Sequence, residues 1–330
     1  VNLKNDATYS ITAQITQITG TQTVAYAGYT TSYFDGGRAI IDGGVAGASY
    51  TLLSAGGTNH FYSDIIFQNN GATGSAIGLT CGGRNIFFRC VVNNIRGHGI
   101  NSSSNALFLE CEMYACNQSN TASTAGINLT VGTLVRCVSH DNAGSNSSGF
   151  SIAGVACYMY ECISDTNGQH GIFINSTTAT PVIKNCDIYN NGSNGITSAG
   201  GGSFIPLLIE NCNILKNGGW GILPGSDAIT IGILTNCGFG TGTQANASGD
   251  ISGLAHVVQI GTINYASNIT PWVDPANGDF RINLGNAKGT GRGTFTETQG
   301  GYSGTVGYPD IGAGQSKVIY PQPRIDGGFN

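Results

Sequence analysis

The chain has 330 residues and a formal net charge of −5, and only 9% of its residues are charged, against about 25% in an average globular protein. It contains no run of Lys or Arg that could displace counterions from a phosphate backbone, so the sequence predicts no nucleic-acid binding. It also lacks an apolar run of the roughly 18 residues that a membrane span requires. Apolar residues make up 40% of the chain and recur at a regular interval, which favours a repetitive β fold over disorder.

Residues 1–60 form the first predicted segment, a set of irregular N-terminal coils. Alternating stretches such as 9–18 predict short strands, and the Gly-rich sequence at 35–37 predicts a turn. No amphipathic helix in this segment could cover the open edge of a sheet. Because the chain begins with Val1, we expect upstream sequence or a partner subunit at this end.

Residues 61–240 form the second predicted segment, in which three sets of residues recur about every 24 positions. The first set consists of cysteines that each follow a short apolar stretch: Cys90, Cys111, Cys137, Cys162, Cys186, Cys212 and Cys237. The second is a Gly followed by an apolar residue, at 99–100, 126–127, 149–150, 171–172, 195–196 and 221–222. The third lies five residues after the cysteine in four repeats: Asn142, Asn167, Asn191 and Asn217.

Three sets of residues that keep one register indicate a solenoid in which each repeat forms one coil. Short apolar strands separated by Asn and Gly turns can stack at the ~4.8 Å spacing of neighbouring strands. Equivalent side chains then lie over one another, and neighbouring coils bury each other's apolar faces. We therefore predict an all-β fold, a right-handed parallel β-helix of about nine coils with a C-terminal capping segment.

The segments at 184–196 (KNCDIYNNGSNGI) and 210–222 (ENCNILKNGGWGI) carry a resemblance to a known superfamily. They resemble repeats of the pectate-lyase-like right-handed parallel β-helix superfamily, and the resemblance covers roughly residues 61–240. It implies the fold and a place among phage spike, fibre and decoration proteins or secreted polysaccharide-active proteins. Since many activities share this scaffold, the resemblance does not choose between them.

The seven recurring cysteines are interpreted as small apolar residues that fill the interior of the coils. Their spacing contains no C-x₂-C pair, so it favours neither a metal site nor a disulfide framework. The candidates for disulfide pairing are Cys81, Cys116 and Cys157, and the sequence leaves that pairing open. Cys116 occupies the position of the recurring Asn and is expected to be partly exposed.

The residue before the cysteine alternates in charge over four repeats: Arg89, Glu110, Arg136 and Glu161. These side chains should point outward if the cysteines point inward, because strand residues alternate between faces. Unlike charges would then lie one strand spacing apart, as a ladder that stabilises the register. The alternative is a polar strip that binds sugar hydroxyls or a carboxylate, and these four residues with Tyr160 are the candidate ligand-binding set. Further aromatic residues that could stack on sugar rings are Tyr114, Tyr158, Tyr189 and Trp220.

The sequence identifies candidate catalytic residues less clearly than candidate ligand-binding residues. The segment 96–100 (RGHGI) resembles the Gly-His-Gly element of the polygalacturonase family, but the aspartates and the Arg-Ile-Lys element of that family are missing. His98 shares its position in the repeat with His170, which favours a structural role. His140 and Asp141 could form a general base and its partner, or a pair that stabilises a turn. If the chain is an enzyme, the candidates are His98, Arg136, His140 and Asp141.

Residues 241–330 form the third predicted segment, with the last coils, a cap and an extended tail. The stretches 272–282 (WVDPANGDFRI) and 308–315 (YPDIGAGQ) resemble the endings of secreted or phage-encoded β-helix proteins, where such stretches cover the last coil. Residues 285–307 are rich in Gly and Thr and predict a long loop. The tail at 320–330 contains two prolines and predicts an extended segment that could reach a neighbouring subunit.

Two classes of function fit these observations. We predict a structural or adhesive protein of a virion or extracellular surface, of the spike, fibre or decoration type, which faces a polysaccharide or surface glycan without cleaving it. Such a protein is expected to form a homo-oligomer, a trimer by the resemblance, or to bind other virion or surface proteins. The alternative is a polysaccharide lyase or glycoside hydrolase that acts in a groove along the β-helix. No metal or cofactor is predicted, except that a lyase of this superfamily would use Ca²⁺, which needs several converging oxygen ligands.

Overall fold

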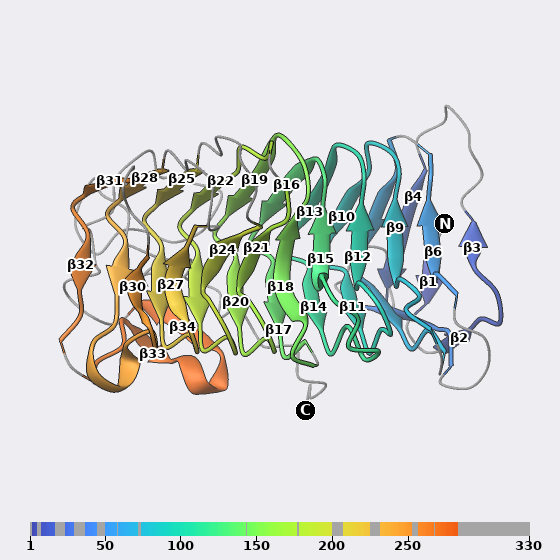
Figure 1. Cartoon of the computed structure of the whole chain (residues 1–330). Coiled ribbons are helices and arrows are strands. Elements are labelled where there is room, and N and C mark those ends of the chain that lie inside the picture. Colours follow the sequence, from blue (N-terminus) through green and yellow to red (C-terminus); the bar gives the residue numbers. More distant parts are fainter. Residues whose placement is uncertain are drawn as a thin grey trace.

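A computed structural model describes residues 2–282, apart from gaps at 5–7, 17–23, 30–36, 45–49, 58, 72–73, 143, 177, 200–206, 225–231, 253–256 and 267. In this part of the chain, three parallel sheets wind around one axis, and successive strands pass from the first sheet to the second and then to the third (Figure 1). The predicted all-β solenoid of about nine coils is confirmed. The stack extends to ten complete coils and two strands of an eleventh, because strands of residues 1–60 join the same three sheets.

The sheets contain eleven, eleven and ten strands. The first consists of β1 (Asn2–Lys4), β4 (Ala25–Tyr29), β7 (Phe61–Ser63), β10 (Ile86–Phe88), β13 (Ala106–Leu109), β16 (Gly132–Val135), β19 (Cys157–Tyr160), β22 (Val182–Lys184), β25 (Leu207–Glu210), β28 (Gly232–Thr235) and β31 (Val257–Ile260). The second consists of β2 (Thr8–Ser10), β5 (Ala39–Asp42), β8 (Ile65–Gln68), β11 (Val91–Asn93), β14 (Glu112–Tyr114), β17 (Val138–His140), β20 (Ile163–Asp165), β23 (Asp187–Tyr189), β26 (Asn213–Leu215), β29 (Gly238–Phe239) and β32 (Ile263–Asn264).

The third sheet consists of β3 (Ile15–Thr16), β6 (Leu53–Ala55), β9 (Leu79–Cys81), β12 (Ile100–Ser102), β15 (Thr124–Leu129), β18 (Ser147–Ile152), β21 (Ile172–Ile174), β24 (Ile196–Ser198), β27 (Trp220–Leu223) and β30 (Gly249–Ile251). Two short 3₁₀ segments, η1 (Gly242–Gln244) and η2 (Pro275–Asn277), are the only helical turns of the described residues. An antiparallel hairpin, β33 (Trp272–Asp274) and β34 (Asp279–Ile282), completes the set.

Interior side chains stack from coil to coil, because the parallel register places like positions over one another. In the first sheet, the rings of Tyr26, Tyr62, Phe87 and Phe108 form one column, with centroids 5.0, 4.7 and 5.0 Å apart. That separation is one strand spacing. The stack therefore extends the hydrogen-bonded register into the core, where each ring covers the apolar face of the next.

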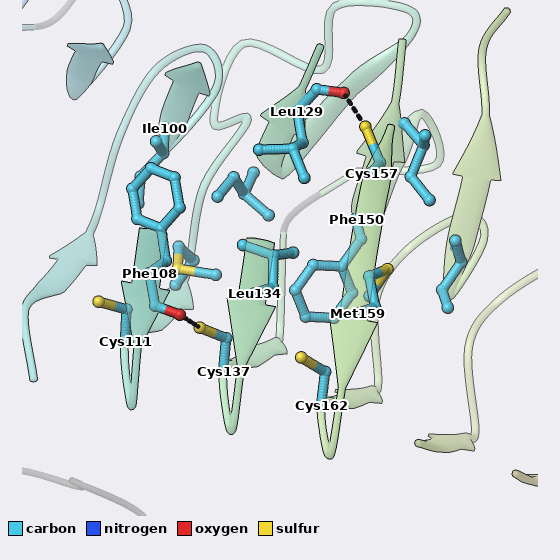
Figure 2. Packing of buried hydrophobic residues seen from close by; sticks show 14 of the residues in the cluster. Ile100, Phe108, Cys111, Leu129, Leu134, Cys137, Phe150, Cys157, Met159 and Cys162 are labelled. Carbon is cyan, nitrogen blue, oxygen red and sulfur yellow. Dashed lines mark hydrogen bonds between the residues drawn. The ribbon is translucent and has the colours of Figure 1, made fainter. Parts of the chain in front are cut away.

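The recurring cysteines lie in register directly before the strands of the second sheet, and all seven are buried. Figure 2 shows the sulfurs of Cys111, Cys137 and Cys162 in one row. Several thiols donate to a carbonyl of the preceding coil, as Cys137 does to Phe108 at 3.4 Å. All ten cysteines of the chain are unpaired and buried, which settles Cys81, Cys116 and Cys157 as free thiols. Cys116 was expected to be partly exposed, but it is fully buried, because the turn position points into the core.

The recurring asparagines form a hydrogen-bonded column at the turn between the second and third sheets. The backbone N–H of Asn142 donates to Oδ1 of Asn167, and the same contact joins Asn167 to Asn191 and Asn191 to Asn217. Cys116 begins the column by donating its N–H to Asn142, and Asn246 ends it by accepting from Asn217. Every member except Asn246 lies one residue after a left-handed backbone position such as Asp141 (φ 48°). Each amide thus satisfies backbone groups that the turn would leave unpaired.

The hairpin β33–β34 lies against the outer face of the second sheet, along the side of the stack (Figure 1). Trp272 and Phe280 pack edge-on against Tyr189, with centroids 5.3 and 6.0 Å away. The stretch 272–282, which the sequence predicts to cover the last coil, lies along the side of the stack, and Tyr265 at the end of the last coil belongs to the same apolar cluster. The aromatic rings of this stretch pack on an outward-facing apolar surface formed by Ile163, Tyr189 and Leu215. The predicted loop at 285–307, the stretch 308–315 and the tail at 320–330 lie outside the described residues.

Candidate functional site

The corner between the first and second sheets holds most of the predicted ligand-binding residues. From β10 and β11 to β28 and β29, two residues connect the strands there, and the first of them adopts a left-handed conformation: φ is 51° at Arg89, 54° at Glu110, 54° at Arg136 and 56° at Glu161. This conformation turns the chain sharply into the next sheet, so that the cysteine that follows points inward. The charged side chain remains on the outside of the corner.

The same position is occupied by other residues in the neighbouring coils. Asp64 (φ 57°) precedes the predicted ladder, and Asn185, Asn211 and Asn236 follow it with φ between 51° and 54°. The amide Nδ2 of Asn211 donates to Oδ1 of Asn185 at 3.0 Å, so amides continue the column where the charges stop. Asp64 could not be recognised from the sequence as a corner residue, because Ile65 replaces the cysteine that follows this position in the other coils. Without that cysteine, the sequence does not show where this coil aligns with its neighbours.

Ion pairs join residues of adjacent coils along this corner. Nη2 of Arg89 lies 2.7 Å from Oδ1 of Asp64, and Nη2 of Arg136 lies 2.6 Å from Oε1 of Glu110. One residue earlier in the register, Nζ of Lys184 lies 2.7 Å from Oε2 of Glu210. Each pair joins neighbouring coils. Within the predicted ladder Arg136 pairs with Glu110, whereas Arg89 pairs with Asp64.

Aromatic rings lie beside these charges. Tyr158 and Tyr160 project outward from β19 with parallel rings, 6.4 Å between centroids and 6° between planes, and Tyr158 is exposed. The guanidinium of Arg89 lies 4.8 Å from the ring centroid of Phe88. Flat rings next to ion pairs offer both an apolar face and hydrogen-bonding groups to a polar ligand. We call the corner residues Arg89, Glu110, Arg136 and Glu161, with Asp64, Tyr158, Tyr160, Lys184 and Glu210, the corner strip.

His140 belongs to a separate cluster on the outer face of the second sheet. Its Nδ1 lies 2.7 Å from Oδ2 of Asp141, and its Nε2 lies 2.9 Å from Oε1 of Glu112 in the preceding coil. Burial disfavours the charged imidazole, but the hydrogen bonds from Asp141 and Glu112 and the charge of Asp165 outweigh it and raise the pKa of His140 to about 9. Tyr114 stacks on the ring, with centroids 5.3 Å apart.

His98 and His170 have a different role from His140. Both are half-buried at the turn before the third sheet, where Nδ1 of His98 accepts the backbone N–H of Ala125 at 3.1 Å and Nδ1 of His170 accepts that of Asn194 at 3.3 Å. Burial lowers the pKa of His98, and it lowers the pKa of His170 to about 4. Asn194 repeats the contact with the N–H of Trp220. At this position of the repeat, the side chain accepts a hydrogen bond from the next coil.

The structure therefore brings His140 and Asp141 together with Glu112, which sequence reasoning missed, while Arg136 and His98 contact other groups. With both ring nitrogens donating to carboxylates, the His140 imidazolium has no lone pair with which to accept a proton. Among the described residues, no group of three or more His, Cys, Asp or Glu is arranged to hold a metal ion. No helix in this part of the chain is long and apolar enough to cross a bilayer.

Comparison with known proteins bears on the fold. Residues 102–237 match the family model described as "Right handed beta helix region", and no curated protein sequence matches the chain. Among solved structures, pectate lyase Pel9A aligns with a TM-score of 0.61 at 14% identity, over 96% of this chain and 86% of that one. The A-module of the Azotobacter vinelandii mannuronan C-5 epimerase AlgE4 gives a TM-score of 0.58 at 14% identity, over 81% and 86%. The A-module of AlgE6 from the same organism gives 0.54 at 14% identity, over 81% and 91%.

Proposed function

We propose that this chain, which has the right-handed parallel β-helix fold, is a structural or adhesive protein of a virion or extracellular surface. In this proposal the corner strip binds a glycan lengthwise, and the protein neither cleaves the glycan nor needs a cofactor. Partners of the same type are other copies of the chain, as a trimer, or other surface proteins.

The observation that carries this proposal is the backbone conformation of the charged corner residues. A left-handed residue other than Gly costs on the order of 1 kcal/mol, and Asn and Asp adopt this conformation more readily than Arg or Glu. Three neighbouring coils place Asn at this position, at 185, 211 and 236. The pair of Arg136 and Glu110 lies at the surface, with side chains 23% and 29% exposed, and such pairs contribute little to stability in return. Stability alone would therefore favour Asn at Glu110 and Arg136, so a surface role accounts better for their charges.

Glycan recognition suits the chemistry of the corner strip. Sugars present hydroxyl groups on their edges and apolar C–H groups on their faces, so they bind to combinations of charged hydrogen-bonding groups and exposed aromatic rings. Arg89 and Arg136 supply donors, Glu110 supplies acceptors, and Tyr158 and Tyr160 supply a flat surface. The solved structures with similar folds are named for pectate and for mannuronan, which supports a polysaccharide as the ligand class.

A lyase or glycoside hydrolase is the second candidate, and the cluster of Glu112, His140 and Asp141 favours it. Paired carboxylates around a histidine can serve acid–base chemistry once one ring nitrogen is released. In the observed geometry both ring nitrogens of His140 are hydrogen-bonded to carboxylates, which supports a binding role for the protein over a catalytic one. Ca²⁺ would be an added requirement of a lyase only.

Binding and turnover measured on the same samples test this proposal. The full chain would be incubated with pectate, alginate, hyaluronan and dextran, with Ca²⁺ and without it. Binding would be followed by biolayer interferometry, and cleavage by new reducing or unsaturated ends. We expect binding to at least one acidic glycan without new ends. Turnover that disappears in His140→Gln would establish the enzyme instead, and binding that is unchanged in Arg136→Gln would move the site away from the corner strip.

A further inference from the structure

We infer that the corner strip selects an acidic glycan that carries one negative charge per disaccharide, bound along the axis of the stack. This inference rests on the proposed function and adds the class of ligand. Its basis is the spacing of the positive charges along the corner.

Cations occur on every second coil. The pairing of β10 with β13 and of β13 with β16 places Arg89, Glu110 and Arg136 on three successive coils. The pairing of β16 with β19 and of β19 with β22 places Glu161 and then Lys184 on the next two. Two strand spacings are about 9–10 Å, so Arg89, Arg136 and Lys184 follow one another at about that interval. An extended disaccharide unit has a similar length.

Exposure favours contact with the cations. The side chains of Arg89, Arg136 and Lys184 are 34%, 23% and 32% exposed, whereas Asp64 is 1% exposed and Glu210 is 12% exposed. Glu161 is buried as well. The carboxylate that reaches the surface is Glu110, at 29%. A ligand that lies on the strip therefore meets positive charge on alternate coils.

The coils between the cations suit an uncharged sugar. The coil between Arg136 and Lys184 carries Tyr158 and Tyr160, whose parallel rings offer a flat apolar face. The coil between Arg89 and Arg136 carries Glu110, which repels a second carboxylate at that point. A glycan charged on every sugar would place half of its carboxylates over Glu110 and over the rings of Tyr158 and Tyr160. A glycan charged on every second sugar can place each carboxylate over a cation.

The first test compares three glycans on the full chain at low ionic strength. Hyaluronan carries one carboxylate per disaccharide, polygalacturonate carries one on every sugar, and dextran is neutral. We expect hyaluronan oligosaccharides to bind about tenfold more tightly than polygalacturonate of equal length, the effect of about one charged contact. Dextran should bind most weakly. Equal or tighter binding of polygalacturonate would overturn the inference.

The second test exchanges one ion pair. The double variant Glu110→Arg/Arg136→Glu retains the ion pair between the two coils. Both positions have φ of 54°, so each new side chain meets the same backbone conformation as the one it replaces. The exchange moves the cation by one coil. It also places like charges on neighbouring coils, beside Arg89 and beside Glu161, so we expect a small loss of thermal stability. We expect about tenfold weaker hyaluronan binding, since one charged contact is lost. Lys216→Gln, which removes a cation over the Tyr189 ring at another corner, should leave binding unchanged. If the exchange has no effect on binding, the ladder is structural and the inference fails.

These outcomes separate the inference from the proposed function. If no glycan binds, both are wrong. Glycans could instead bind without cleavage, with an affinity that depends neither on their charge spacing nor on the exchange of Glu110 and Arg136. In that case the binding function stands and the assignment of the disaccharide class is wrong.

Discussion

Three histidines show how the position of one side chain in the coil decides its chemistry. His98 and His170 are half-buried at the turn before the third sheet, where burial lowers their pKa and each ring accepts a backbone N–H. His140 lies on the outer face between two carboxylates, and its pKa rises to about 9 despite its burial. The same residue type thus serves as a neutral acceptor in two coils and as a cation in another.

The pKa of His140 predicts how its contribution to stability changes with pH. The folded value of about 9 exceeds the unfolded value of about 6.5, so the contribution is fully present below about pH 6.5 and is lost as pH rises through about 9. We expect the difference in unfolding free energy between the wild type and His140→Gln to shrink by about 2 kcal/mol from about pH 7 to about pH 9.5. Chemical denaturation at both values measures it.

His170→Gln is the matched control for this measurement. Its folded pKa of about 4 lies below the unfolded value, so the ring is neutral in both states above about pH 7. The difference between wild type and this variant should therefore be flat over the same range. A flat difference for His140→Gln as well would contradict the carboxylate cluster.

The Asn column predicts a large effect at Asn191. Its Oδ1 accepts from the backbone N–H and from Nδ2 of Asn167, at 3.2 and 2.9 Å, and its Nδ2 donates to Oδ1 of Asn217 at 3.0 Å. Asn191→Ala leaves these buried groups without partners, and we expect a loss of about 2–3 kcal/mol in unfolding free energy. Gln118→Ala removes an exposed amide as a control. Equal stability of the two variants would show that the column is dispensable.

Single residues were predictable where the repeat length was constant and the marker was present. The cysteines and the four asparagines share one offset, so their alignment follows from the sequence. Asn246 lies 29 residues after Asn217, because η1 lengthens that coil, and its place in the column was not predictable. The contact between Glu112 and His140 spans 28 residues and depends on which face each residue occupies.

At the scale of elements, the strands and their order were predictable, but the docking of the hairpin was not. The sequence at 272–282 contains a turn, since Gly278 has φ of 76° after η2, and two aromatic residues that must be buried. Nothing in that stretch identifies the surface that buries them. That surface is formed by one residue from each of several coils, namely Ile163, Tyr189 and Leu215, so it exists only after the coils have stacked.

The hairpin predicts a contrast between two neighbouring residues of β33. Trp272 is buried against Tyr189 and Phe280, whereas Val273 is 47% exposed. Trp272→Ala should weaken hairpin docking by about 3–5 kcal/mol, and Val273→Ala should leave it unchanged. Limited proteolysis between β33 and β34 measures the docking. Similar cleavage rates in the two variants would mean that the hairpin does not rely on this contact.

At the scale of the whole molecule, the described coils contact their immediate neighbours, apart from the hairpin and Tyr265, whose hydroxyl reaches Asn213 two coils away. Stability in such a stack is close to a sum over coils and their interfaces. Central coils have a neighbour on each side, whereas β1–β3 and β31–β32 stand at the ends of the sheets.

Hydrogen exchange should therefore be slowest in the central strands, from β13 to β27, and faster toward both ends. Within that central region, β20, β23 and β26 gain further protection from the hairpin. Exchange measured by mass spectrometry on peptides from each coil tests this gradient. Uniform protection along the chain would mean that the stack opens only as one unit.

The ten unpaired thiols have a consequence for where this protein can be made. No crosslink stabilises the coils, so the chain needs no oxidant and no isomerase to reach its fold. It can therefore complete folding under reducing conditions, and the closed coils afterwards keep oxidants away from sulfur. The period of risk is the folding reaction itself, when several thiols are open to mispairing.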